Sequence, residues 1–266
     1  MIIGGNKVVP VIRDWVIPQT RYQEEKVLIS LLAQSDLFDL IEKVEKGERL
    51  DEADGLRLLK SRDILALGYM ANLIRERRHG KQAFFTLRTD TDTDAETKTD
   101  TDTNTLQTDT ETIRTEGYSH FSRDAVLPYG EVRGAEARLE RILKIREEQD
   151  RTGSFSAFMP LSDAFSDVFN KEETDEISGI GAATGLEDLK VLAVSRILLD
   201  NIPHIKTQGV MLGLKLTQVS LAFGVDYIDF FVGGGLTRQS VIRLIQAAGR
   251  EAAEVSQRER QARGYC

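Results

Sequence analysis

The chain has 266 residues, a net charge of −8, an apolar fraction of 41% and a charged fraction of 29%, which are ordinary values for a globular protein of one large or two small domains. The negative charge argues against nucleic acid or an anionic membrane as the main partner. Because no apolar run approaches the ~20 residues that span a bilayer and the first residues lack a signal-peptide pattern, we expect a cytoplasmic protein.

Residues 1–85 are expected to form a helical amino-terminal segment. Apolar side chains recur at helical spacing in residues 24–46 and 61–80, with a short amphipathic stretch between them. The second segment ends in a run of arginines followed by Gly80, which suits the carboxyl end of a helix better than a nucleic-acid patch. The sequence QAFFTL then predicts a strand.

Residues 86–117 form a low-complexity insert of Thr and Asp. Leu106 is the only large apolar residue between Thr89 and Thr112, so burial cannot offset the backbone ordering cost of about 1–2 kcal/mol per residue. We therefore expect disorder. An extended Thr-Asp strand and an Asp-based calcium site are the alternatives, although the segment lacks the turn-making glycine of a calcium loop.

Residues 118–250 alternate strand-like and helix-like patterns. Strands are expected at AVLPYG, FSAFMPL, GVMLG and VDYIDFFV, each followed by a helix. This rhythm predicts βα units and a parallel sheet. Because a full eight-unit barrel takes about 250 residues, we predict an α/β fold that is a partial or broken (β/α) TIM-like barrel, followed by a charged tail at residues 251–266.

Metal-ligating residues are few in this sequence. The single cysteine, Cys266, permits no intramolecular disulfide and no Cys-rich cluster within one chain. The three histidines, His79, His120 and His204, show no zinc-motif spacing. We therefore expect no metal site.

The run LDNIPHIK followed by VMLG is the most distinctive part of residues 184–229. Together with residues 57–85, 129–161 and 236–251, it resembles the aminofutalosine synthases, radical S-adenosylmethionine enzymes of the futalosine route to menaquinone. Dehypoxanthine-futalosine cyclases and deazaflavin-cofactor synthases share the run more loosely. The resemblance implies a barrel that binds an iron–sulfur cluster through C-x-x-x-C-x-x-C, and an adenosyl radical that adds to an enolpyruvyl-ether benzoate.

The family's cysteine motif directly follows the strand that ends in Phe-Phe, and this chain has residues 86–117 there, without a cysteine. Because the cluster needs three thiolates, we expect a degenerate homologue that binds no iron–sulfur cluster and is catalytically inactive alone. One alternative is a non-enzymatic binding protein that pairs with itself or an intact homologue. Another is an acid–base enzyme that uses His204.

The resemblance places Asp200, Asn201, His204 and Lys206 near the substrate end of a βα unit, where barrel sites gather. With Gln218 on the following helix, they are the candidate substrate-pocket residues. Judged by residue type alone, Asp200 and Asn201 equally suit a helix end and turn. His204 suits a base or a structural group, Lys206 a carboxylate partner or the surface, and Gln218 a packing or capping role.

Overall fold

The computed structural model describes residues 27–28, 30–88, 124–129, 134–161, 185–231 and 236–255. Residues 89–117 of the predicted insert lie outside the described residues, so the expected disorder stays a prediction. Cys266 and residues 256–266 of the predicted tail also lie outside them.

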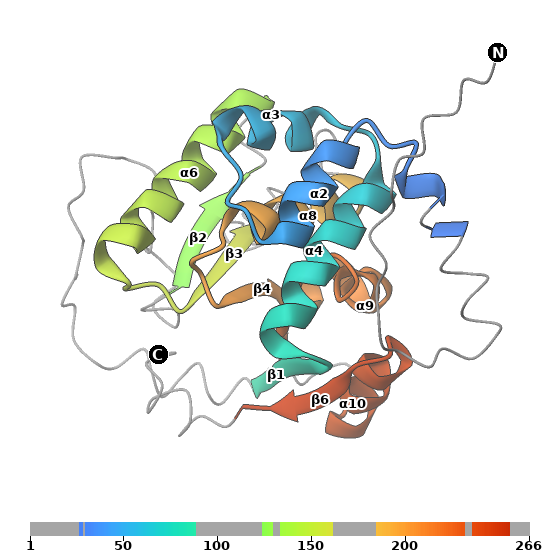
Figure 1. Ribbon diagram of the computed structural model, residues 1–266. Helices are drawn as coiled ribbons and strands as arrows, with labels where there is room; N and C mark the ends of the chain where they lie inside the picture. Colours follow the sequence, from blue (N-terminus) through green and yellow to red (C-terminus); the bar gives the residue numbers. More distant parts are fainter. Residues whose placement is uncertain are drawn as a thin grey trace, which may run out of the picture.

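A parallel sheet of six strands forms the centre of the molecule (Figure 1). The strands are β1 (Gln82–Arg88), β2 (Asp124–Pro128), β3 (Ala157–Leu161), β4 (His204–Gln208), β5 (Tyr227–Phe231) and β6 (Glu251–Glu254). Their order is β2-β3-β4-β5-β1-β6, and every neighbouring pair is parallel. Within the described ranges β2 and β6 are edges, so the barrel-like sheet is open, which agrees with the predicted partial barrel.

Helices form two further layers above the sheet (Figure 1). Three of them, α4 (Ile64–His79), α6 (Ala135–Thr152) and α8 (Gly185–Leu198), pack over one face. Outside these lie α2 (Phe38–Lys46), which contacts α4, and α3 (Glu52–Lys60), which contacts α6 and α8. Helices α9 (Gly209–Ser220) and α10 (Arg238–Ala247) follow β4 and β5.

The strands carry different side chains on their two faces, because successive side chains of a strand point to opposite sides. Phe85, Ile205 and Ile228 are fully buried in the main apolar core that the helices share. Thr86 and Lys206 are also buried, but alternate with those residues and so lie on the opposite, inner face. The sheet therefore has an apolar outer face and an inner face that carries buried polar side chains.

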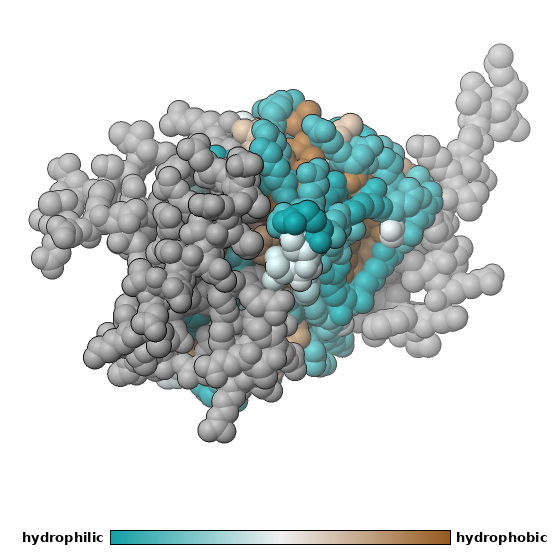
Figure 2. Space-filling model, turned by 90° about the vertical axis from the view of Figure 1, so that its left-hand side faces the viewer, coloured by the Kyte–Doolittle hydropathy of each residue, from teal (hydrophilic) through white to brown (hydrophobic). Residues whose placement is uncertain are grey.

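Hydrophilic and hydrophobic side chains are also distributed unequally over the surface. Figure 2 shows hydrophilic side chains on the outside of the described elements, with hydrophobic residues visible mainly between them. In the described part of the chain, no helix combines the length and apolar character that a bilayer crossing needs.

The helix end expected at Gly80 is confirmed. Helix α4 begins after Asp63, whose carboxylate accepts a hydrogen bond from the Ala66 amide, and ends at Gly80 with φ of 58°. Helix α6 ends at Gly153 in the left-handed conformation. The helix expected over residues 24–46 is instead broken before α2, where the Ser35 hydroxyl accepts a hydrogen bond from the Leu37 amide and competes with helical pairing.

One strand expectation and two segment boundaries differ from the structure. GVMLG begins α9, and the strand is the preceding HIKTQ; an apolar run this short does not distinguish strand from helix. The strand expected at QAFFTL is confirmed as β1, which runs to Arg88 and so passes the segment boundary expected at residue 85. Residues 251–254 of the expected tail form β6, which pairs with β1.

Candidate functional site

Six buried polar side chains gather on the inner face of the sheet, and we name them the inner-face cluster. They are Thr86 and Arg88 of β1, Asp124 of β2, Lys206 and Gln208 of β4, and Asp229 of β5. Strand register brings the central members together, because Gln208 is paired with Asp229 and Asp229 with Thr86. Three neighbouring strands thus present polar groups at one level.

Lys206 joins the two carboxylates of the inner-face cluster. Its Nζ atom lies 3.0 Å from Asp124 Oδ2 and 3.0 Å from Asp229 Oδ2. The same atom lies 4.8 Å from the centroid of the Tyr227 ring, a cation–π distance. Only 5% of the Lys206 side chain is exposed, so these partners take the place of water around its ammonium group.

Asp229 is held ionised by its neighbours. Burial raises its pKa, but the charges of Lys206 and Arg88 and a hydrogen bond from the Thr86 hydroxyl outweigh burial, so the pKa lies below its usual value. Arg88 Nη2 is 4.0 Å from Asp229 Oδ2. Arg88 and Lys206 therefore balance the two carboxylates of the cluster.

Two members of the cluster lie at the carboxyl ends of their strands. Arg88 and Gln208 are the last residues of β1 and β4. Gln208 is 3% exposed, and its Oε1 atom has no hydrogen-bond partner among the described residues. Barrel enzymes hold their ligands at this end of the sheet, and a buried amide oxygen without a partner is a place where a ligand can donate a hydrogen bond.

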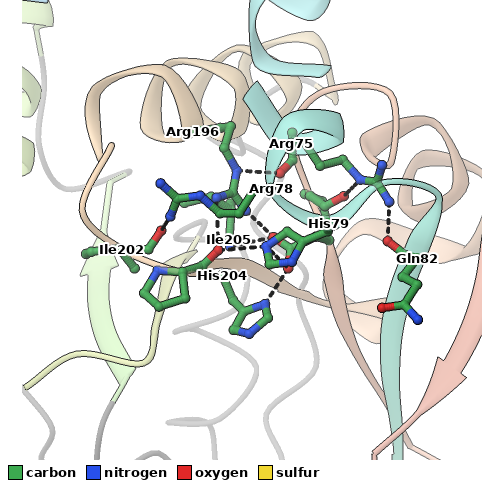
Figure 3. Close-up of polar contacts among 12 residues, drawn as sticks. Arg75, Arg78, His79, Gln82, Arg196, Ile202, His204 and Ile205 are labelled. Carbon is green, nitrogen blue, oxygen red and sulfur yellow. Dashed lines mark hydrogen bonds and ion pairs between the residues drawn. The ribbon is translucent and has the colours of Figure 1, made fainter. Parts of the chain in front are cut away.

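A second polar group lies at the opposite end of the sheet, and we name it the amino-end cluster (Figure 3). It consists of His79, Arg196, His204 and Asp226. Arg196 Nη2 and the Ile205 amide donate to Asp226 Oδ1, the latter at 2.9 Å. His204 Nδ1 contacts Asp226 Oδ2, and His79 Nε2 lies 3.3 Å from the same oxygen.

Burial and charge set the protonation of this cluster. Burial raises the pKa of Asp226, but Arg196 and His204 outweigh it and lower the pKa to about 2. Burial lowers the pKa of Arg196 to about 10 and also lowers that of His79. At neutral pH the cluster therefore contains a carboxylate, a guanidinium and a neutral His79 ring.

Gly224 allows the backbone to pass close to Arg196 of the amino-end cluster. Its φ is 90°, and a Cβ atom at this position would lie 2.6 Å from Arg196 Cβ. The Gly224 carbonyl accepts a hydrogen bond from Arg196 Nε at 2.9 Å. This turn leads directly into Asp226, so a glycine two residues earlier fixes where the carboxylate meets Arg196.

The expectation that Asp200, Asn201 and His204 lie near the substrate end is wrong. Strand β4 begins at His204, so these residues lie at the amino end of the strand. Asp200 Oδ1 pairs with Arg49 Nε at 2.9 Å. Asn201 Nδ2 donates to the Arg146 carbonyl at 2.7 Å. For both residues, the alternative interpretation as a helix end and turn is the better one.

The other two candidate residues, Lys206 and Gln218, lie in different parts of the structure. Lys206 belongs to the inner-face cluster and is buried between carboxylates. Gln218 Nε2 donates to the Leu244 carbonyl at 3.0 Å and so connects α9 with α10, which agrees with a packing role. The sequence analysis missed Thr86, Arg88, Asp124, Gln208 and Asp229. The available signal was the alternation of polar residues in HIKTQ and the acid in YIDFF.

Comparison with solved structures defines the class of fold. The chain resembles HydG, a maturase of the [FeFe]-hydrogenase, with a TM-score of 0.58 over 91% of this chain and 81% of that chain, at 9% identity. At this identity the likeness concerns the fold alone, a barrel-type α/β architecture.

Sequence relatives agree with the expected family resemblance, although no family model matches. The chain is 34% identical to the aminodeoxyfutalosine synthase of Streptomyces coelicolor over 52% of this chain and 40% of the relative. It is 38% identical to the aminodeoxyfutalosine synthase of Thermus thermophilus over 49% of this chain and 38% of the relative. It is also 38% identical to a 5-amino-6-(D-ribitylamino)uracil--L-tyrosine 4-hydroxyphenyl transferase of Methanosarcina barkeri, over 51% of this chain and 35% of the relative. The chain spans less than half the length of these relatives and is related to the aminodeoxyfutalosine synthase family, so the family resemblance is confirmed.

Proposed function

We propose that this chain is a member of the aminodeoxyfutalosine synthase family that produces no adenosyl radical alone and retains a small-molecule site at the inner-face cluster. The observation that carries the first part is the absence of cysteine between Arg88 and Asp124, the stretch where the family's cluster motif belongs. An iron–sulfur cluster is held by thiolates. The hydroxyls and carboxylates found here are hard oxygen donors that do not replace them, so the residues present do not fit the cluster.

The second part rests on the inner-face cluster. Its four charged groups are formally balanced, so a dry interior can hold them without a counterion. Gln208 Oε1 remains as a buried acceptor at the carboxyl end of β4. A small polar molecule that donates a hydrogen bond, such as the aminodeoxyfutalosine in the relatives' name, suits that position.

A second candidate function is an interaction protein that pairs with itself or with an intact homologue. The open edges of the described sheet, β2 and β6, favour it, because an unpaired edge presents backbone groups that another strand can pair with. Acid–base catalysis by His204 is less well supported, because His204 lies at the amino end of the sheet against Asp226.

Anaerobic reconstitution tests the loss of radical chemistry. The purified chain, treated with iron and sulfide and supplied with S-adenosylmethionine, is expected to show no broad visible absorbance and to release no deoxyadenosine. The Thermus thermophilus relative, treated in parallel, is the positive control for the procedure. Release of deoxyadenosine and methionine by this chain alone would overturn the proposal.

Thermal unfolding with added aminodeoxyfutalosine tests the retained site. Stabilisation of the wild-type chain and its loss in Gln208→Leu are expected, because a ligand that binds the folded state raises the unfolding temperature. Gln218→Leu is the matched control, since Gln218 contacts Leu244 and not the cluster. Equal shifts in both variants would place the ligand elsewhere, and co-purification with an intact homologue would favour the interaction protein.

A further inference from the structure

We propose that His79, His204 and Asp226 bind a divalent transition-metal ion of the zinc type. One potential ligand atom from each residue lies within 4.8 Å of the other two. The three come from separate places in the sequence: the last residue of α4, the first residue of β4 and the residue before β5. No local sequence motif could therefore have indicated the site.

The carboxylate of Asp226 is oriented as a ligand. Its Oδ1 atom is held by Arg196 Nη2 and by the Ile205 amide. Its Oδ2 atom faces the two imidazoles, with His79 Nε2 at 3.3 Å. Groups that fix the orientation of a ligating carboxylate in this way are typical of metal sites.

The two histidine rings are placed to act together. They stack with centroids 4.9 Å apart and an interplanar angle of 14°. His79 Nε2 donates a hydrogen bond to the Pro203 carbonyl oxygen at 2.9 Å, and a bound ion would take the place of that proton. Figure 3 shows the rings of His79 and His204 together beneath Arg196. Nitrogen and oxygen atoms thus converge on one small volume.

The donor set selects the class of ion. Two imidazole nitrogens and one carboxylate oxygen suit zinc and its neighbours, whereas calcium and magnesium prefer oxygen ligands alone. Three protein ligands leave a fourth tetrahedral position for water or for another small ligand. The ion would enter past His79, whose side chain is 12% exposed, because that of Asp226 is fully buried.

Arg196 limits the strength of the site. Its guanidinium already balances Asp226, so a bound dication adds positive charge close to a buried cation. We therefore expect reversible binding that a chelator removes, in contrast to structural zinc sites that hold their ion through several thiolates.

Cobalt(II) titration of the purified chain tests the proposal. Binding of a single ion to the three ligands is expected to give the visible absorption bands of tetrahedral Co²⁺ and to be reversed by Zn²⁺ but not by Mg²⁺. The magnesium arm separates this site from the acidic residues of the Thr-Asp insert, which are oxygen donors. His79→Gln is expected to abolish the bands, and Asp200→Asn, a carboxylate paired with Arg49 at the surface, to leave them unchanged.

A hydrogen-bonded triad without an ion is the competing interpretation. Absence of Co²⁺ bands in the wild-type chain, or bands of unchanged intensity in His79→Gln, would overturn the proposal. Far-ultraviolet circular dichroism shows whether His79→Gln is folded. Should it not be, the wild-type chain decides, because Zn²⁺ is expected to raise its unfolding temperature and a lack of stabilisation also contradicts a site in the folded state.

Discussion

Arg196 and Asp226 form an ion pair in which both side chains are completely buried. Arg196 also donates to the carbonyl oxygens of Gly224 and Pro203, at 2.9 Å and 3.1 Å. One guanidinium therefore connects α8 with the segments that lead into β4 and β5. Removing its charge partner leaves a buried cation attached to several parts of the chain.

Asp226→Asn is therefore expected to lower the free energy of unfolding by about 3–5 kcal/mol, the usual cost of breaking a buried pair from one side. Urea denaturation in the presence of a chelator measures the change. Arg196→Met combined with Asp226→Asn is expected to cost less than the sum of the two single variants, since the double variant leaves no unpaired charge. Strict additivity would show that the two residues stabilise the fold independently.

Lys206→Met is expected to destabilise the folded chain by a similar ~3–5 kcal/mol, because Asp124 and Asp229 then face each other's charge without their shared cation. Lys215→Met on α9 is the matched control. Lys215 is exposed, and a surface substitution of this kind usually changes stability by less than about 0.5 kcal/mol. Equal effects of the two substitutions in urea denaturation would contradict the role given to Lys206.

The loss of unfolding free energy at acidic pH is expected to depend on Asp229. Its pKa is lowered in the folded chain, so the unfolded chain binds the proton first. This stabilisation is complete above the unfolded pKa of about 3.9 and is lost as the pH falls through the lower folded value. Asp229→Asn should therefore flatten the dependence of unfolding free energy on pH below about pH 4.

Asp39→Asn provides the control for the pH experiment. A hydrogen bond from Arg57 also lowers the pKa of Asp39, but 56% of its side chain is exposed. Solvent screens such a pair, so the slope should change less than in Asp229→Asn. A larger change for Asp39 would mean that surface pairs, and not the inner-face cluster, govern acid unfolding.

Gly224→Ala and Gly249→Ala separate backbone strain from lack of space. Both glycines have positive φ, 90° and 73°, but a Cβ atom meets Arg196 at Gly224 and nothing within 4 Å at Gly249. Gly249→Ala is expected to cost about 1–2 kcal/mol for the left-handed conformation alone. Gly224→Ala should cost more and also weaken the Arg196 contacts, and thermal unfolding of the two variants compares them.

Much of the fold follows from local sequence signals. The arginines before Gly80 and the glycine after Thr152 mark real helix ends, because caps act within a single turn. The alternation of strands and helices after residue 123 indicates a parallel sheet, because each helix between two strands returns the chain to the same end of the sheet. Strand β4 was not predicted, because its inward side chains, His204, Lys206 and Gln208, are of types that usually lie on the surface.

The candidate site depends on contacts that no local pattern contains. Lys206 is 82 positions from Asp124 in the sequence, and strand register alone decides that they meet. His79 and Asp226 are joined in the same way, across α4 and the turn before β5. Resemblance pointed to His204 and Lys206 together, but the strand carries one toward its amino end and the other into the inner-face cluster.

Strand β1 finds both of its neighbours, β5 and β6, near the far end of the chain. During synthesis, Phe85 and Thr86 therefore leave the ribosome long before the strands that shield them. Contacts between residues so distant in sequence slow folding and prolong the exposure of unpaired, aggregation-prone strands. We expect chaperone dependence during expression, and early termination before Glu251 should leave β1 without a neighbour on one side.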